Sequence, residues 1–159
     1  MNIYKHLTII FILVFITSCQ TVGLKNNVYG DVITVLDGDT LTLLDDSKKV
    51  YTVHLADIDA PDNNQLFSSE AKTTLFQLAF DRPVRVEIYE TNYNTLKGRV
   101  FVEDIDVCAE LVKAGLATVS STTQDPQLLD LERQAQEAGR GVWARYTPEL
   151  EISRSRRIR

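Results

Sequence analysis

Aspartates gather at two places in the first half of the chain, and their spacing suggests a cation site. Asp37 and Asp39 lie on either side of a glycine, and Asp57, Asp59 and Asp62 fall within the stretch ADIDAPD. Carboxylates and backbone carbonyls are the ligands that Ca²⁺ takes, at about 2.3 to 2.6 Å. If the fold brings the two clusters together, they form a site for a hard cation, and calcium is the first expectation.

Residues that bind softer metals are scarce. The histidines of the sequence are His6 and His54, and its cysteines are Cys19 and Cys108, so a zinc site built from nitrogen and sulfur ligands is not expected. The aspartates also have a simpler interpretation, because Asp-Gly favours tight turns and an Asp-Ala-Pro-Asp loop is ordinary surface sequence. Residue types alone therefore leave a cation site and plain turns as alternatives.

Alternating apolar residues predict strands around both clusters. Residues 28–36, 40–44 and 50–56 alternate and are separated by turn sequences, so they predict a three-stranded meander. Two more strands are expected at residues 83–89 and 99–103, joined by a polar loop over Glu90 to Gly98.

Three helices are expected between and after these strands. Apolar residues recur at helical spacing from Ser68, and a short helix that contains Cys108 is expected to begin at Asp106 and end at Gly115. A last helix begins at Asp125, with proline at the first helical position. Together the elements predict an α+β fold, mainly β, with five strands in a small barrel and Cys108 as an inert core residue.

The N-terminus has the layout of a signal peptide. The apolar run of residues 7–16 follows Lys5 and precedes small polar residues, and it is shorter than the roughly 20 residues that span a bilayer. The tetrad Ile-Thr-Ser-Cys ending at Cys19 resembles the bacterial lipobox, in which the cysteine is lipidated and becomes the first mature residue. A plain secretory signal with an incidental cysteine is the alternative.

These features divide the chain into four parts. We expect a lipoprotein signal peptide over residues 1–18, a linker over 19–27, one domain over 28–147 and a basic tail over 148–159. Lipidated Cys19 would anchor the protein to a membrane of the cell envelope, which is the outer membrane if the bacterium is diderm.

The charge balance restricts how nucleic acid could bind. The whole chain carries −5, and without Lys5 and the four arginines of the tail, residues 19–151 carry −10. Phosphate neutralisation usually gives a nucleic-acid-binding protein a positive surface, so here a local basic patch has to supply it. The tail is either a solvated terminus or a segment that binds anionic lipid or nucleic acid.

Five segments resemble, in order, the staphylococcal nuclease (thermonuclease) family: VITVLDGDTLTL, VHLADIDAPD, KGRVFV, AELVKAGLATV and AQEAGRGVWA, within residues 28–144. The resemblance implies an OB-fold five-stranded barrel with three helices. It also implies calcium-dependent hydrolysis of phosphodiester bonds in DNA or RNA, and no protein partner is predicted.

The resemblance also implies roles for individual residues. Asp39 and Asp59 match the calcium-binding aspartates, and Ala60 matches the residue that lends a backbone carbonyl. Arg99 falls on the arginine that contacts the scissile phosphate. Asp62 falls where a glutamate orients the attacking water, and His54 falls where the family has a second phosphate-binding arginine.

Several of these positions depart from the family pattern. Asp62 is one methylene shorter than glutamate, and His54 cannot form the fork of an arginine and is not a permanent cation. Lys97 replaces an aromatic residue, and Ser120 and Ser121 replace tyrosines that would stack on bases. We therefore expect weakened nuclease activity. The alternative is a noncatalytic OB-fold binding or envelope lipoprotein that keeps the fold.

Overall fold

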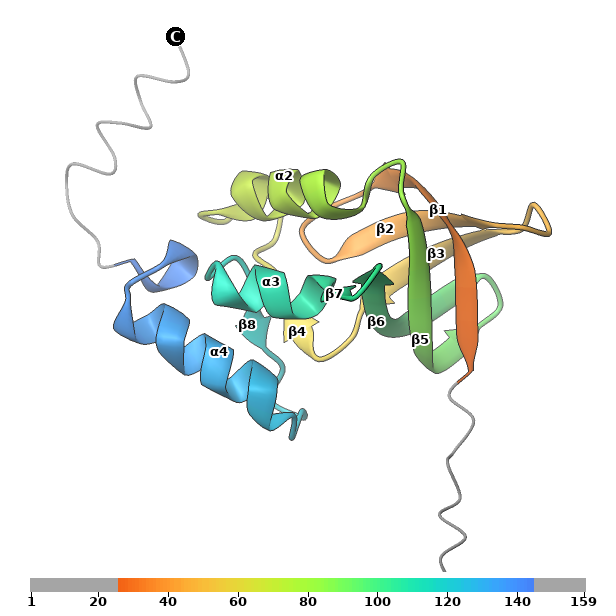
Figure 1. The fold of residues 1–159 in the computed structure, drawn as a ribbon. Coiled ribbons are helices and arrows are strands. Elements are labelled where there is room, and N and C mark those ends of the chain that lie inside the picture. The colour runs from red at the N-terminus through yellow and green to blue at the C-terminus, as the bar shows by residue number, and fades with distance from the viewer. Residues whose placement is uncertain (1–25, 145–159) are drawn as a thin grey trace, which may run out of the picture.

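The computed structural model describes residues 26–144 (Figure 1). The predicted signal peptide, the lipidation site Cys19 and the basic tail from residue 148 lie outside the described residues. The predicted domain from residue 28 to 147 is described up to residue 144.

Five strands close into a barrel. They are β1 (Asn27–Val35), β2 (Thr40–Asp45), β3 (Val50–Leu55), β5 (Pro83–Asn92) and β6 (Thr95–Val102). Neighbouring strands are antiparallel in the order β3-β2-β1-β5-β6, and a parallel pairing between β3 and β6 closes the ring. Together with its three helices, this barrel confirms the predicted OB-type fold of mainly β structure.

The barrel interior follows from the alternation of apolar residues. Each strand turns one set of side chains inward, as expected for the two-residue period of a strand. The buried residues from the five strands include Val32, Leu41, Leu43, Val53, Leu55, Val84, Val86, Leu96 and Val100.

Three helices accompany the barrel: α2 (Ser68–Ala79) and α3 (Val107–Lys113) lie against it, and α4 (Pro126–Glu137) packs on α3 on the side away from the barrel strands (Figure 1). The 3₁₀ turn η2 (Gly141–Trp143) follows α4. Strand β4 (Ile58–Asp59) pairs with β8 (Thr118–Val119), and β7 (Ile105–Asp106) pairs with the end of β6. None of the helices in the described part of the chain is long and apolar enough to cross a membrane.

The predicted polar loop from Glu90 to Gly98 is wrong. Strands β5 and β6 run through most of it and pair down to Asn92 and Thr95, and the turn contains Tyr93, which is 92% exposed. Strand β6 also pairs with β3 over residues 95–98. These two ladders satisfy the backbone, so a polar segment forms strand although local sequence suggests a loop.

Gly38 is required for packing. A Cβ at this position would lie 2.8 Å from the Cβ of Ala60 and 2.8 Å from the Cβ of Ala71. The segment between β1 and β2 therefore lies directly against α2 and against the second aspartate cluster. The glycine between Asp37 and Asp39 allows this approach. The interpretation of Asp37-Gly38 as a plain turn did not predict this packing contact.

Gly38→Ala should destabilise the protein by about 1 to 3 kcal/mol, because the added methyl overpacks this contact. Urea denaturation followed by circular dichroism measures the loss. Asp46→Ala in the exposed β2–β3 turn is the control and should leave the midpoint unchanged. Equal midpoints for Gly38→Ala and the wild type would contradict the packing role.

Candidate functional site

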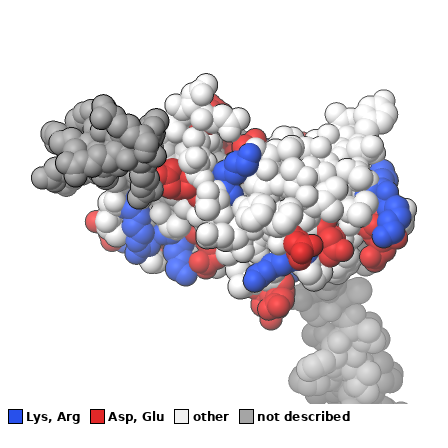
Figure 2. Space-filling view, turned by 90° about the horizontal axis from the view of Figure 1, so that it is seen from above, with Lys and Arg blue, Asp and Glu red and all other residues white. Residues whose placement is uncertain are grey.

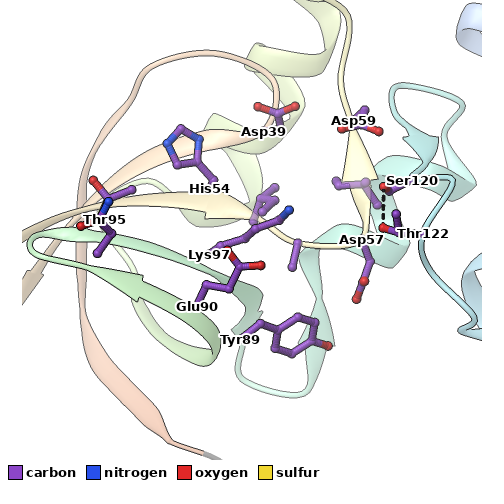
Figure 3. Close-up of a pocket in the computed structure, with 14 residues that line it drawn as sticks. Asp39, His54, Asp57, Asp59, Tyr89, Glu90, Thr95, Lys97, Ser120 and Thr122 are labelled. Atoms are coloured by element: carbon purple, nitrogen blue, oxygen red, sulfur yellow. Dashed lines mark hydrogen bonds between the residues drawn. The ribbon is translucent and has the colours of Figure 1, made fainter.

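A polar pocket of about 580 Å³ opens at the ends of β3, β4, β5 and β6 (Figure 3). Its volume is within the range of small-ligand sites. Residues from both aspartate clusters line it, together with polar residues of β3, of β5 and β6, and of the segment after β8: Asp39, His54, Asp57, Asp59, Tyr89, Glu90, Asn92, Thr95, Lys97, Ser120 and Thr122. The fold thus brings the two clusters together, as the cation-site interpretation requires.

Asp39 forms the link between the clusters. Its Oδ2 accepts a hydrogen bond from the Ala60 backbone N–H at 2.8 Å, and its Oδ1 accepts one from Thr40 Oγ1 at 3.1 Å. Burial raises the pKa of Asp39, and the negative charge of Asp37 raises it further, against the effect of the Ala60 N–H. The carboxylate is therefore fixed in direction, and within residues 26–144 it forms no ion pair with a lysine or arginine.

Asp59 and His54 complete this side of the pocket. Asp59 lies on β4, and its carbonyl accepts a hydrogen bond from Thr118 Oγ1 at 3.3 Å. His54 Nδ1 lies 3.2 Å from Thr40 Oγ1, so Thr40 contacts both His54 and Asp39. Figure 3 shows Asp39 and Asp59 on the same side of the opening.

Arg99 is held beside the pocket by two carboxylates. One terminal nitrogen binds Asp125 and the other binds Asp106, and its side chain is 11% exposed. Burial by itself would lower the pKa of Arg99, but the charge of Asp106 and the hydrogen bonds to Asp125 and Asp106 raise it. The predicted phosphate-binding guanidinium is thus already neutralised in this structure, and it does not line the pocket.

Both carboxylates that hold Arg99 also cap helices. Asp106 Oδ1 accepts from the backbone N–H groups of Cys108 and Ala109 at the start of α3. Asp125 Oδ1 accepts from Gln127 N at the start of α4. Each aspartate therefore uses one oxygen for a helix and the other for Arg99, which joins β6 to both helix N-termini.

Asp62 does not line the pocket. Gln65 Nε2 donates to its Oδ2 at 3.2 Å, and its backbone N–H donates to Gln65 Oε1 at 3.2 Å. The predicted water-orienting carboxylate is therefore bound within the turn that precedes α2.

Tyr89 and Glu90 are pocket residues that the sequence did not indicate, and Lys97, which the sequence indicated only as the replacement of an aromatic residue, also lines the pocket. Burial and the charge of Asp57 raise the pKa of the Tyr89 hydroxyl, while Arg99 lowers it, so this hydroxyl interacts electrostatically with both charged groups. All three residues come from the hairpin whose ends were predicted as a loop. These residues lie near Arg99 along the paired strands β5 and β6. This nearness to a predicted site residue was the signal that could have indicated them as part of the site.

The oxygen donors of the pocket suit a hard cation that keeps some coordination positions for water or substrate. Asp39 and Asp59 offer carboxylate oxygens, and Ala60 offers a backbone carbonyl. Within residues 26–144, no group of three or more His, Cys, Asp or Glu side chains is placed to hold a metal. Carbonyls, water and substrate oxygens would have to supply the remaining ligands, which calcium accepts and zinc sites rarely use.

The face that carries α2 has no continuous positive patch among its described residues. In Figure 2, Lys and Arg side chains stand singly and mostly beside acidic ones on this face. This face therefore does not supply the local basic region that phosphate binding requires.

The barrel and its polar pocket define an OB-fold protein, a class whose members bind oligonucleotides or oligosaccharides. Residues 52–145 match the sequence profile of the family described as "Staphylococcal nuclease homologue". The chain belongs to this family.

Curated relatives agree with this assignment. The chain is 35% identical to an "Uncharacterized endonuclease" of Haemophilus influenzae, over 79% of this chain and 71% of the relative. It is 31% identical to an "Uncharacterized endonuclease" of Escherichia coli O157:H7, over 77% and 81%, and 30% identical to the "Micrococcal nuclease" of Shigella flexneri, over 72% and 73%. The predictions of the family and of a nuclease-type hydrolase are confirmed.

Asp125→Asn should destabilise the protein by about 1 to 2 kcal/mol at pH 7, because asparagine still caps α4 but cannot neutralise Arg99. Burial would raise the pKa of Asp125, but hydrogen bonds from Arg99 and the Gln127 N–H lower it. A lowered folded-state pKa contributes stability above the unfolded value of about 3.9, and this contribution is lost as pH falls through the folded value.

The difference between wild type and Asp125→Asn should therefore shrink as pH falls from about 6 to below about 4. Urea denaturation across this range measures it. Asp130→Asn on the same helix is the control, since Asp130 pairs with Arg133 at the surface, and its effect should be much smaller at every pH. A pH-independent difference for Asp125→Asn would contradict the ion-pair explanation.

Proposed function

We propose that this protein is a calcium-dependent nuclease that cleaves phosphodiester bonds of DNA or RNA slowly, at the pocket that contains Asp39 and Asp59. The observation that carries the proposal is the convergence of the two aspartate clusters. Asp39 is fixed by the Ala60 N–H and has no ion pair within the described residues, while Asp59 lines the same pocket.

The protein groups have distinct tasks in this mechanism. Asp39, Asp59 and the Ala60 carbonyl would hold the cation, and the Ala60 N–H keeps the Asp39 carboxylate in position. When bound, calcium would supply positive charge to neutralise a phosphate oxygen. Arg99 would stabilise the phosphate with those N–H groups that Asp106 and Asp125 leave free, and Asp62 would orient water after it leaves Gln65.

Slow turnover is expected because Arg99 and Asp62 are both already bound to other residues of the protein. A phosphate has to compete with two carboxylates for Arg99, and Asp62 has to give up its hydrogen bonds with Gln65. Misplacement of a catalytic group by about 1 Å costs on the order of a hundredfold in rate. The same two observations favour the second candidate, a noncatalytic OB-fold binding protein.

We also propose that lipidated Cys19 anchors the protein to a membrane of the cell envelope. The sequence of residues 16–19 supports this, and the barrel begins shortly afterwards, at Asn27. A short linker would hold the pocket close to the membrane surface, where the enzyme would act on nucleic acid outside the cytoplasm.

Asp39→Asn should abolish calcium-dependent cleavage of single-stranded DNA and of RNA by the full chain, lowering the rate by at least about a hundredfold. Addition of a chelator to the wild type should have the same effect. Calcium should also raise the melting temperature of the wild type, since ligand binding to the folded state stabilises it, and it should not do so for Asp39→Asn.

The matched control is Asp46→Asn, which removes one negative charge from an exposed turn and should retain both cleavage and calcium stabilisation. Calcium stabilisation without cleavage by the wild type would support the binding-protein candidate. Cleavage that persists in Asp39→Asn would refute the proposed site.

Cys19→Ser should move the protein from the membrane fraction to the soluble fraction and remove labelling by an alkynyl fatty acid. Cys108→Ala is the control and should change neither. Burial, with the charge of Asp106, raises the pKa of the Cys108 thiol to about 12, so this residue is not open to modification. Labelling of Cys19→Ser at the wild-type level would contradict the anchor.

A further inference from the structure

Lys97 is the one lysine or arginine among the residues that line the pocket. Four carboxylates surround the same space: Asp39, Asp57, Asp59 and Glu90. Within residues 26–144, the Lys97 ammonium has neither an ion pair nor a side-chain hydrogen bond. A positive group that faces an open pocket without a protein partner is available to an incoming anion.

The barrel closure places Lys97 next to His54. In the parallel pairing of β3 with β6, the two residues are direct partners, so their side chains point to the same face of the sheet. Leu96 and Gly98, on either side of Lys97, are buried, while Lys97 and His54 are exposed. Figure 3 shows the lysine side chain directed into the middle of the pocket, between His54 and Asp57.

The neighbouring cations are less suited to meet a ligand. Arg99 is two residues further along β6, and its terminal nitrogens already bind Asp106 and Asp125. His54 places one ring nitrogen beside Thr40 and is not a permanent cation. Lys97 is therefore the permanent positive charge of the pocket that is not already paired.

We propose that Lys97 binds a backbone phosphate of the nucleic-acid substrate, supplying from β6 the charge that His54 does not supply from β3. This inference rests on the proposed nuclease function. An ammonium group binds phosphate as a point charge, without the fixed fork of a guanidinium. Its attraction is felt equally by substrate and transition state, so it contributes affinity more than turnover.

Lys97 also determines which part of the substrate the pocket recognises. A backbone phosphate is common to every nucleotide, whereas an aromatic ring at this position would stack on a base. The pocket thus selects a phosphodiester chain by its charge, with little preference among bases.

Binding is tested with the full chain in detergent and a fluorescent single-stranded oligothymidylate whose phosphorothioate linkages resist cleavage. Lys97→Gln should weaken binding about tenfold, the loss expected for one charged hydrogen bond. It should also reduce the slope of log affinity against log salt concentration by about 0.7, the share of one phosphate contact on a single strand.

Two variants separate a direct contact from a structural effect. Lys97→Arg keeps the charge and should bind within about twofold of wild type. Lys113→Gln removes the same charge from an exposed position on α3, where the lysine pairs with Glu110, and should leave affinity and slope unchanged. In cleavage assays with calcium, Lys97→Gln should raise KM about tenfold and change kcat by less than about twofold.

Compensation from the neighbouring strand is the sharpest test. Adding His54→Arg to Lys97→Gln should restore most of the lost affinity and the salt slope, because both positions face one phosphate. Unchanged affinity in Lys97→Gln, or weaker binding with an unchanged salt slope, would overturn the inference. Lys97-dependent binding without cleavage would support it while refuting the proposed nuclease function, and absence of binding by the wild type would overturn both.

Discussion

The parallel pairing between β3 and β6 is the interaction on which the rest of the structure depends. It closes the barrel and places His54 opposite Lys97, and it continues beyond the ladder in a hydrogen bond from Ala56 N to Gly98 O at 2.9 Å. Gly98 also allows the other neighbour of β6 to approach, because a Cβ there would collide with the Glu87 carbonyl oxygen of β5. Both walls of the pocket are fixed by this closure, since one belongs to β3 and β4 and the other to β5 and β6.

The same strand connects the barrel to its helices through Arg99. Two helix-capping aspartates share its guanidinium, so the buried charge is neutralised by groups that also satisfy helix N-termini. Breaking one partner of such a buried pair is costly because the remaining charge is left uncompensated. The arginine therefore stabilises the fold, and this role would compete directly with the phosphate binding proposed for it. This conflict is the physical basis of the slow catalysis that we propose.

The acidic domain makes cations central to any contact with nucleic acid. Residues 19–151 carry −10, and the pocket itself presents four carboxylates. The divalent cation proposed at Asp39 and Asp59 would supply positive charge at this place, together with the ammonium of Lys97, which has no ion pair within residues 26–144. Desolvated charges interact more strongly inside a pocket than at the surface, so a few groups can offset an unfavourable net charge.

The sequence by itself determined the elements and the family. Apolar alternation predicted the strands β1, β2 and β3, and the capping residues Asp106 and Asp125 predicted where α3 and α4 begin, because these signals are local in the chain. The ordered motifs identified the staphylococcal nuclease family, and they named Asp39 and Asp59 before their side chains could be seen in one pocket.

Only the tertiary structure decided what each side chain contacts. The polar residues 90–98 form strand because two distant ladders satisfy their backbone, which no local pattern reports. The pairing of Arg99 with Asp125 joins residues 26 positions apart, and Lys97 gains its place beside His54 through the barrel closure. Local sequence specifies the strands with apolar alternation and the helix caps, whereas the strand formed by polar residues and the free or occupied state of a charge depend on the residues that folding brings next to them.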